Sequence, residues 1–264
     1  MHKELSFGRD SLKIIAYVAM LIDHIFYILY EAYFMSENYR FSFESIDDDP
    51  IYLIGRSIGR LTFIILSYLI GQGIIYSKNR IKYILRLVLL GIITEPIVHL
   101  QDLQIITDYK ITISFTNAAF TLALGALAIY LYDKFYEKKV LRISAVILMM
   151  LLSYVLNTEF SMAGVFLVFA SYKYRHNIFD LIIKGFIPYV ILKNFMFLMH
   201  SNTLDISIKT MVNCIFYVDY FGIIAYFFLY YFDPKKSGRL NKTACYLFYP
   251  VHLLIIYLLK FLIF

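Results

Sequence analysis

Apolar runs recur from one end of this chain to the other and are separated by short polar connections, and each run is close to the roughly 20 residues that a helix needs to cross a bilayer. The runs lack the strict alternation of apolar and polar positions that the strands of a membrane β-barrel require. The pattern therefore predicts an all-α polytopic transmembrane bundle, with residues 1–264 forming a single integral membrane domain. The nine helices that we expect lie at residues 12–32, 51–76, 80–100, 117–133, 140–156, 161–174, 178–199, 210–232 and 245–263.

The connections between these runs alternate in charge. The segment 33–50 is acidic, and the segment 101–116 has Lys110 as its single basic residue. Because basic loops of membrane proteins stay in the cytoplasm, we expect a cytoplasmic N-terminus and, after an odd number of helices, an extracytoplasmic C-terminus. The cytoplasmic side would carry Lys3, Arg9, Lys13, Lys78, Arg80, Lys82, Arg86, Lys134, Lys138, Lys139, Arg142, Lys173, Arg175, Lys184, Lys235, Lys236, Arg239 and Lys242.

The composition agrees with a membrane protein, since 61% of the residues are hydrophobic and 17% are charged. The net charge of +6 reflects the cytoplasmic loops, so we expect a lipid bilayer and no nucleic acid as partner. The first apolar run is too long for the core of a signal peptide and lacks a small-residue cleavage site, so it is expected to remain as the first helix. Cys214 and Cys245 fall in or beside apolar runs and are expected to be packing residues. A multi-pass protein of the bacterial cytoplasmic membrane is the predicted localisation.

Ionisable side chains recur at membrane depth, where each of them is costly. Asp23 and His24 stand side by side near the middle of the first run. Others follow in later runs: Arg56, Arg60, Glu95, His99, Lys193, Asp219 and His252. Any one of them can be explained as half of an ion pair that holds two helices together. As a set they indicate a polar cavity, in which a carboxylate orients a histidine and a cation holds an anion.

Three classes of protein remain open on this pattern. In a proton-coupled transporter of small solutes, carboxylates and histidines would relay protons across the membrane. In a membrane acyltransferase, a histidine would act as general base on an amine or a hydroxyl. In a non-enzymatic membrane assembly factor, the polar residues would only lock the helices together. The inverted repeats and Gly/Pro-broken helix pairs typical of many transporters are not seen in the sequence.

Four blocks of sequence stand out: LKIIAYVAMLIDHIFYIL at 12–29 with its Asp-His pair, IGRSIGRLTFIILSYLIGQGIIYSKNRIKYILRLVLLGIITEP at 54–96, NAAFTLALG at 117–125 and YLFYPVHLLIIYLL at 246–259. Together they resemble the TraX family, which is named for the conjugative-pilus acetylase. They cover roughly half of the chain, in the order that the family has. Ile64 departs from the pattern, because relatives often have a proline there, so we expect a straighter second helix.

The resemblance implies an enzyme that transfers an acetyl group from acetyl-CoA to the N-terminal amine of a pilin. For this chain the acceptor stays open between a peptide N-terminus, a glycan and a small molecule. We expect His24 to be the general base, and His252 is a second candidate for the base or a contact of coenzyme A. Asp23 points about 100° away from His24 around the helix, so we expect it to pair with Arg56 or Arg60. Glu95 is expected to contact His24 across the cavity.

Further residues are needed to bind acetyl-CoA and to stabilise the negative charge that develops on the carbonyl oxygen during transfer. The matching block of basic residues, which is Lys78, Arg80, Lys82 and Arg86, is expected to hold the phosphates of coenzyme A. The residues expected at the substrate or the oxyanion are Arg56, Arg60, Asn117 and Thr121. Asn117 and Thr121, four positions apart, would donate to the oxyanion or simply bond to a neighbouring helix. No metal is expected, because the histidines and carboxylates have no local ligand spacing.

Overall fold

The computed structural model describes residues 6–36, 46, 49–100, 115–200, 219–236 and 238–264. This part of the chain contains nine helical segments and no strand, so the predicted all-α class is confirmed for the described residues. The predicted helix at 210–232 lies partly outside them. The segments are α1 (Arg9–His24), continued by a π-helix (Ile25–Tyr30) and α2 (Glu31–Met35); α3 (Pro50–Tyr76); α4 (Arg80–Val98); α5 (Ala118–Lys134); α6 (Lys139–Val155); α7 (Ser161–Lys173); α8 (Ile178–Leu181), a π-helical turn (Ile182–Phe186) and α9 (Ile187–His200); a 3₁₀ turn (Tyr220–Ile223) with α11 (Ile224–Tyr230); and α12 (Lys242–Ile263).

Asparagine side chains fix the start of several helices. Asn79 accepts a hydrogen bond from the backbone N–H of Lys82 at the start of α4, and Asn117 accepts one from Ala119 at the start of α5. Asn177 and Asn241 do the same for α8 and α12. The first N–H groups of a helix have no partner within it, so such a cap stabilises the helix and sets its first residue.

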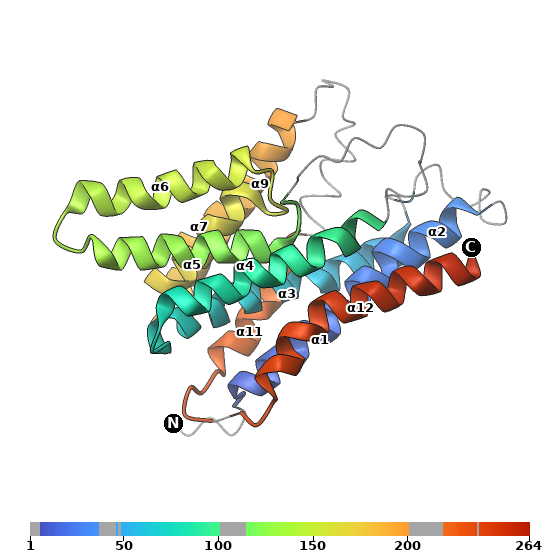
Figure 1. The fold of residues 1–264 in the computed structure, drawn as a ribbon, viewed down its shortest axis with the longest axis horizontal. Coiled ribbons are helices and arrows are strands. Elements are labelled where there is room, and N and C mark those ends of the chain that lie inside the picture. The colour runs from blue at the N-terminus through green and yellow to red at the C-terminus, as the bar shows by residue number, and fades with distance from the viewer. Residues whose placement is uncertain (1–5, 37–45, 47–48, 101–114, 201–218, 237) are drawn as a thin grey trace. The chain divides into compact units, whose positions relative to one another are not determined.

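The described chain divides into two compact units, which are considered one at a time. Unit 1 is residues 1–66 and 201–264, and unit 2 is residues 67–200; α3 contributes to both. The prediction of a single membrane domain stays a prediction. In unit 1, α12 packs in parallel along α1 and the π-helix that continues it (Figure 1). The Thr62 hydroxyl of α3 donates to the backbone oxygen of Ala16, 3.0 Å away, and so joins α3 to α1.

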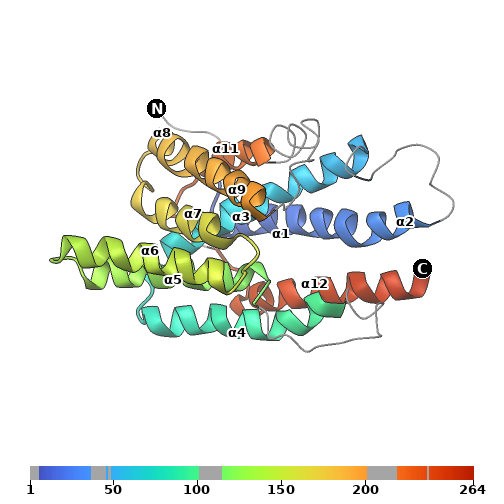
Figure 2. The ribbon, with the colours of Figure 1, turned by 90° about the horizontal axis from the view of Figure 1, so that it is seen from above.

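In unit 2 the helices pack in the order α4, α5, α7 and α9, and α6 lies against both α5 and α7 (Figure 2). The close packing of α4 on α5 and of α5 on α7 depends on glycines. A methyl group on Gly91 of α4 would lie 2.8 Å from the Phe120 ring of α5, and one on Gly125 of α5 would lie 2.5 Å from Val168 of α7. Since α4, α5 and α6 run antiparallel in turn, the start of α4, the end of α5, the start of α6 and the end of α7 meet at one end of unit 2. We call this the basic end.

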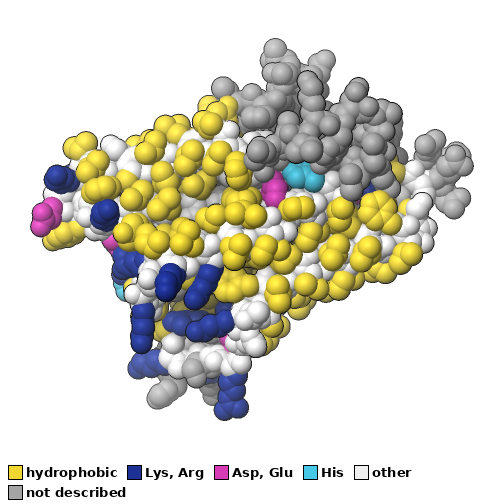
Figure 3. Space-filling model, in the orientation of Figure 1, with side chains coloured by type: hydrophobic (Ala, Val, Ile, Leu, Met, Phe, Trp, Pro, Cys, Tyr) yellow, Lys and Arg dark blue, Asp and Glu magenta, His cyan; other side chains and the backbone are white. Residues whose placement is uncertain are grey.

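Several helices have the length and surface of membrane spans. Within the described residues, three helices are long and apolar enough to cross a membrane: Arg9–Met35, Pro50–Tyr76 and Lys242–Ile263. Large apolar side chains are exposed along the outer faces of α6 and α12, among them Ile147, Leu148, Ile255 and Leu258 (Figure 3). Such faces suit contact with lipid. The protein is therefore a membrane protein with transmembrane helices, and that all nine segments cross the bilayer stays a prediction.

Candidate functional site

Two histidines from opposite ends of the chain meet in unit 1. His24 is the last residue of α1, and His252 lies in α12, 228 positions later. Nδ1 of His24 lies 2.7 Å from Nε2 of His252, and Nδ1 of His252 lies 2.6 Å from the backbone oxygen of Phe248. The Phe248 ring stacks on the His252 ring with an interplanar angle of 15°. These contacts fix the plane of His252 and its distance from His24.

The hydrogen bonds also fix which nitrogen of each neutral ring carries the proton. A carbonyl oxygen only accepts, so Nδ1 of His252 must donate to Phe248. In the neutral ring Nε2 of His252 is then the acceptor, and Nδ1 of His24 must donate to it. The proton of His24 is thereby held on Nδ1, and its Nε2 keeps a lone pair. Nε2 of His24 makes no hydrogen bond within the described residues, so this chain of contacts leaves it able to accept a proton.

Unit 1 also contains two arginine–carboxylate pairs. Asp23 Oδ1 lies 2.5 Å from Nη1 of Arg56, which confirms the predicted pairing of Asp23 with an arginine. The Arg56 guanidinium also lies 4.6 Å from the centre of the Tyr27 ring. Arg60 pairs with Asp219 at 3.6 Å. Each of these two arginines therefore has a carboxylate partner within unit 1. Their expected role at the substrate stays a prediction.

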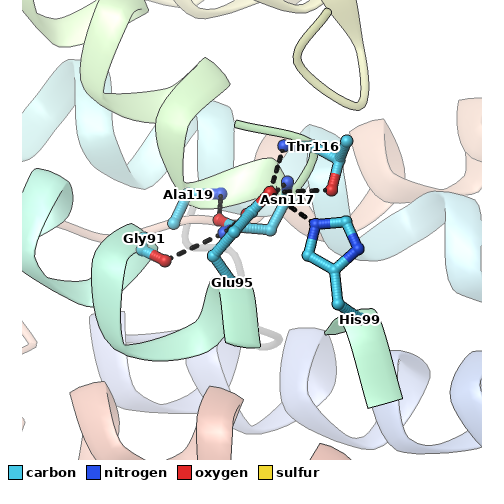
Figure 4. Close-up of polar contacts among 6 residues, drawn as sticks. All are labelled: Gly91, Glu95, His99, Thr116, Asn117 and Ala119. Atoms are coloured by element: carbon cyan, nitrogen blue, oxygen red, sulfur yellow. Dashed lines mark hydrogen bonds and ion pairs between the residues drawn. The ribbon is translucent and has the colours of Figure 1, made fainter. Parts of the chain in front are cut away.

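Glu95 lies in unit 2 at the junction of α4 and α5 (Figure 4). One carboxylate oxygen accepts from the N–H of Thr116, at 2.7 Å, and from the Thr116 hydroxyl, at 2.9 Å. The other accepts from the N–H and the side-chain amide of Asn117. His99, one turn further along α4, has Nε2 3.4 Å from the first oxygen. The four donors on this one carboxylate tie the end of α4 to the start of α5.

The two other predicted site residues of α5 differ in their surroundings. Asn117 is the cap of α5: its amide nitrogen donates to Gly91 and Glu95, and its oxygen accepts from Ala119. Thr121 is fully buried, and its hydroxyl has no hydrogen-bond partner within the described residues. The structure therefore gives Asn117 a structural use, while Thr121 keeps a donor available. The oxyanion role predicted for both stays a prediction.

The predicted phosphate-binding residues lie at the basic end of unit 2. Lys78, Lys82 and Arg86 are exposed. Arg80 instead donates to Asp133 at 2.6 Å, and the Tyr172 hydroxyl donates to the other oxygen of Asp133, also at 2.6 Å. Arg80 is thus neutralised by a carboxylate from the end of α5, which weakens the case that it binds a phosphate.

Some predictions about the site stay open. The expected contact of Glu95 with His24 joins the two units, and it is not tested by the contacts inside either of them. No group of three or more histidine, cysteine, aspartate or glutamate residues suited to a metal ion occurs among the described residues. Sequence reasoning missed Asp133 and the use of His99. The signal for Asp133 was a single carboxylate among basic residues at the end of a helical run. The signal for His99 was its position four residues after Glu95.

Comparison with known proteins finds one family and one curated relative. The family model described as TraX protein matches residues 8–260. The chain is 27% identical over 263 residues to a protein of Dichelobacter nodosus named "Probable fimbrial assembly protein FimC, serogroup H1", and the match covers 96% of each chain. No solved structure matches the chain.

Proposed function

The chain belongs to the TraX family, and from this premise we propose that it is an integral membrane acetyltransferase. It takes the acetyl group of cytoplasmic acetyl-CoA and transfers it to an amine or a hydroxyl. The multi-pass topology, the bacterial cytoplasmic membrane and the cytoplasmic N-terminus are parts of this proposal. The relative named as a fimbrial assembly protein favours a peptide N-terminus as acceptor, while a glycan or a small molecule would need the same chemistry.

One observation carries the proposal: the hydrogen-bonded series from Phe248 through His252 to His24. A general base must present an unprotonated nitrogen to the nucleophile, and a group behind it must hold the ring in that tautomer. Here the Phe248 carbonyl and His252 supply that group, and Nε2 of His24 is the base. We assign His24 as the catalytic residue and His252 as the positioning residue that acts through it.

The proposed step balances without a metal or a redox partner. The acceptor nitrogen or oxygen attacks the thioester carbonyl, and a new N–C or O–C bond forms while the C–S bond breaks. The acceptor's proton passes to Nε2 of His24 and from there to the sulfur of the departing coenzyme A. Donating the Nδ1 proton to His252 stabilises the imidazolium of His24 while it holds the extra proton.

The arginine–carboxylate pairs would hold the base in place and leave it uncharged. Asp23 is next to His24 in sequence but is bound to Arg56, so this pair is close to neutral overall. Asp219 has the same relation to Arg60. Both carboxylates already have cationic partners, so neither pair adds a net charge to unit 1. The pairs also join α1 and the 219–230 segment to α3.

A second candidate, the non-enzymatic assembly factor, is favoured by one observation. The ionisable residues Asp23, Arg60 and Glu95 all have partners that tie helices or helix ends together. In that case the histidine pair would be one more such tie. The two candidates differ in whether His24 is needed for a reaction or for folding.

The test uses the purified full-length protein, radiolabelled acetyl-CoA, and a panel of peptides, glycans and small amines. We expect transfer to at least one acceptor class, loss of about 10²–10⁴-fold in rate for His24→Ala, and unchanged binding of coenzyme A. His176→Ala is the matched control, since His176 is an exposed histidine on the connection between α7 and α8. A fully active His24→Ala protein would contradict the assignment of the base. No transfer by wild-type protein, with His24→Ala unfolded, would favour the assembly factor.

A further inference from the structure

Arg142 has unusual surroundings at the basic end of unit 2. It lies in the first turn of α6, and its guanidinium carbon is 3.6 Å from the centre of the Tyr132 ring at the end of α5. The Tyr136 ring lies 6.0 Å away. Tyr132 is itself supported edge-on by Phe169 of α7, with 4.9 Å between the ring centres. The guanidinium is therefore held flat against an aromatic surface instead of extending freely into water.

The side-chain hydrogen-bond donors of Arg142 are not used by the described part of the protein. Its Nε is buried and has no hydrogen-bond partner there, and no ion pair links it to a described carboxylate. Two other arginines of the basic end differ in this respect. Arg80 is bound to Asp133, and Arg175 donates to the backbone oxygen of Tyr172. A buried donor without a protein partner can be met by a water, an ion or a ligand, and the charge around Arg142 selects among them.

The charge around Arg142 indicates that this ligand is an anion with more than one charge. Lys138 and Lys139 precede Arg142 in the same turn and are both exposed, whereas Glu137 is the sole carboxylate between residues 134 and 142. Figure 3 shows Lys and Arg side chains where α5 turns into α6. Lys138 gives α6 no side-chain cap, so the first N–H groups of this helix add donors at the same place. Side chains of a helix lean toward its N-terminus, which brings Arg142 to those donors.

We propose that Arg142, together with Lys138 and Lys139, binds the 3′-phosphate of coenzyme A. This rests on the proposed function, in which coenzyme A carries the acetyl group. A phosphate monoester is close to doubly charged at neutral pH, and a planar guanidinium can donate two parallel hydrogen bonds to it. The phosphodiester of a lipid headgroup carries a single charge, so three cations suit the monoester better. Arg142 takes the role that the sequence suggested for Arg80, whose charge is used by Asp133.

The test compares two ligands that differ by this one phosphate. Dissociation constants of coenzyme A and 3′-dephospho-coenzyme A are measured by calorimetry on the purified full-length protein in detergent. For wild type we expect coenzyme A to bind about tenfold or more tightly than the dephospho form. In Arg142→Ala the affinity for coenzyme A should fall by about that factor, and the affinity for the dephospho form should stay the same. Arg142→Lys should restore part of the difference.

Lys134→Ala is the matched control, because it removes an exposed positive charge from the same end of unit 2 without touching the Tyr132 stack. If Arg142→Ala does not fold, Arg142→Gln removes the charge but keeps a shorter polar side chain with two N–H donors. The proposal is overturned if the variants weaken both ligands equally, or weaken neither. It is also overturned if Arg142→Ala lowers the affinity of the protein for anionic lipid vesicles and leaves its affinity for coenzyme A unchanged. Wild-type protein that binds neither nucleotide would instead contradict the proposed function.

Discussion

Gly59 of α3 approaches Asp23 of α1 so closely that a methyl group on the glycine would lie 2.2 Å from Cγ of the aspartate. The neighbouring Gly55 has the same relation to the Phe26 ring, again at 2.2 Å. These two glycines, four positions apart, form the side of α3 on which α1 rests. The close approach brings the Asp23 carboxylate within reach of Arg56, which lies between the two glycines along α3.

Gly59→Ala should therefore disturb the pair without removing either charge. The added methyl must displace the carboxylate, and overpacking of this kind costs about 1–3 kcal/mol. We expect a lower temperature of thermal unfolding in detergent. Gly185→Ala is the control, since its methyl would meet Leu181 at 3.2 Å and Ala170 at 3.3 Å, where a small shift suffices. Equal stability of the two variants would show that α1 can move away from α3 at little cost.

Asp23→Asn should destabilise unit 1, because it leaves the Arg56 cation largely buried without its carboxylate. Breaking such a pair costs about 3–5 kcal/mol when the pair is well buried, and Asp23 and Arg56 are 15% and 18% exposed. In the double variant Asp23→Asn with Arg56→Met no charge is stranded, so part of the stability should return. The measurement is a double-mutant cycle of unfolding free energies in detergent. Additive effects of the two substitutions would contradict the idea that the pair acts as a unit.

His252→Phe should lower the rate of transfer while His24 remains in place. The phenyl ring packs like the imidazole but cannot accept the Nδ1 proton of His24, so the proton is no longer held on that nitrogen. We expect a loss of about tenfold or more, and less than the loss in His24→Ala. His252→Gln offers an oxygen to the same proton and should restore part of the rate. Nitrogen NMR of labelled histidines should report the Nδ1–H form of His24 in wild type and a shift toward Nε2–H in His252→Phe.

Glu95→Gln should lower stability more than its small change in shape suggests. Glutamine places an NH₂ group among Thr116 and Asn117 donors, so at least one of them loses its acceptor in a buried junction, at about 1–3 kcal/mol. Thermal unfolding of this variant is compared with that of Glu159→Gln, which changes a carboxylate on the connection between α6 and α7. A stable Glu95→Gln protein without transferase activity would instead place Glu95 in the chemistry, as the sequence suggested.

The proposed topology is tested with reporters. A reporter fused after Phe264 should be extracytoplasmic and one inserted at Lys138 should be cytoplasmic, because basic residues stay on the cytoplasmic side. If both reporters lie on the same side of the membrane, the number of membrane-spanning helices between Lys138 and Phe264 differs by one from the expected number.

Much of the fold followed from the sequence because apolar runs and turn residues are local signals. The run expected at 51–76 is α3 at Pro50–Tyr76, and the run expected at 140–156 is α6 at Lys139–Val155. The arginine partner of Asp23 was also predictable, since a charge at membrane depth needs an opposite one close by. Asn117 as the cap of α5 had a sequence signal as well, because it directly precedes an apolar helical run.

The use of each polar residue was harder to predict. His24 and His252 are 228 positions apart, and no periodicity along one helix shows which face of another it will meet. Glu95 was expected to contact His24, which stays a prediction, and its described contacts with Thr116, Asn117 and His99 could not be read from the sequence. Arg80 seemed free for a phosphate because Asp133, its partner, comes from a helix 53 positions later. Partners of this kind depend on tertiary packing and not on local pattern.

The pairing of α1 with α12 has a consequence for how the protein is made. α1 leaves the ribosome before α12, and its His24 is in the membrane long before α12 has been synthesised. Until then neither His252 nor the Phe248 carbonyl is present, and the proton of His24 can move between its two ring nitrogens. A nascent or truncated chain should thus hold the donor-binding end of unit 2 without an oriented base. The proposed acetyl transfer would begin only when α12 inserts, which keeps partly made protein from consuming acetyl-CoA.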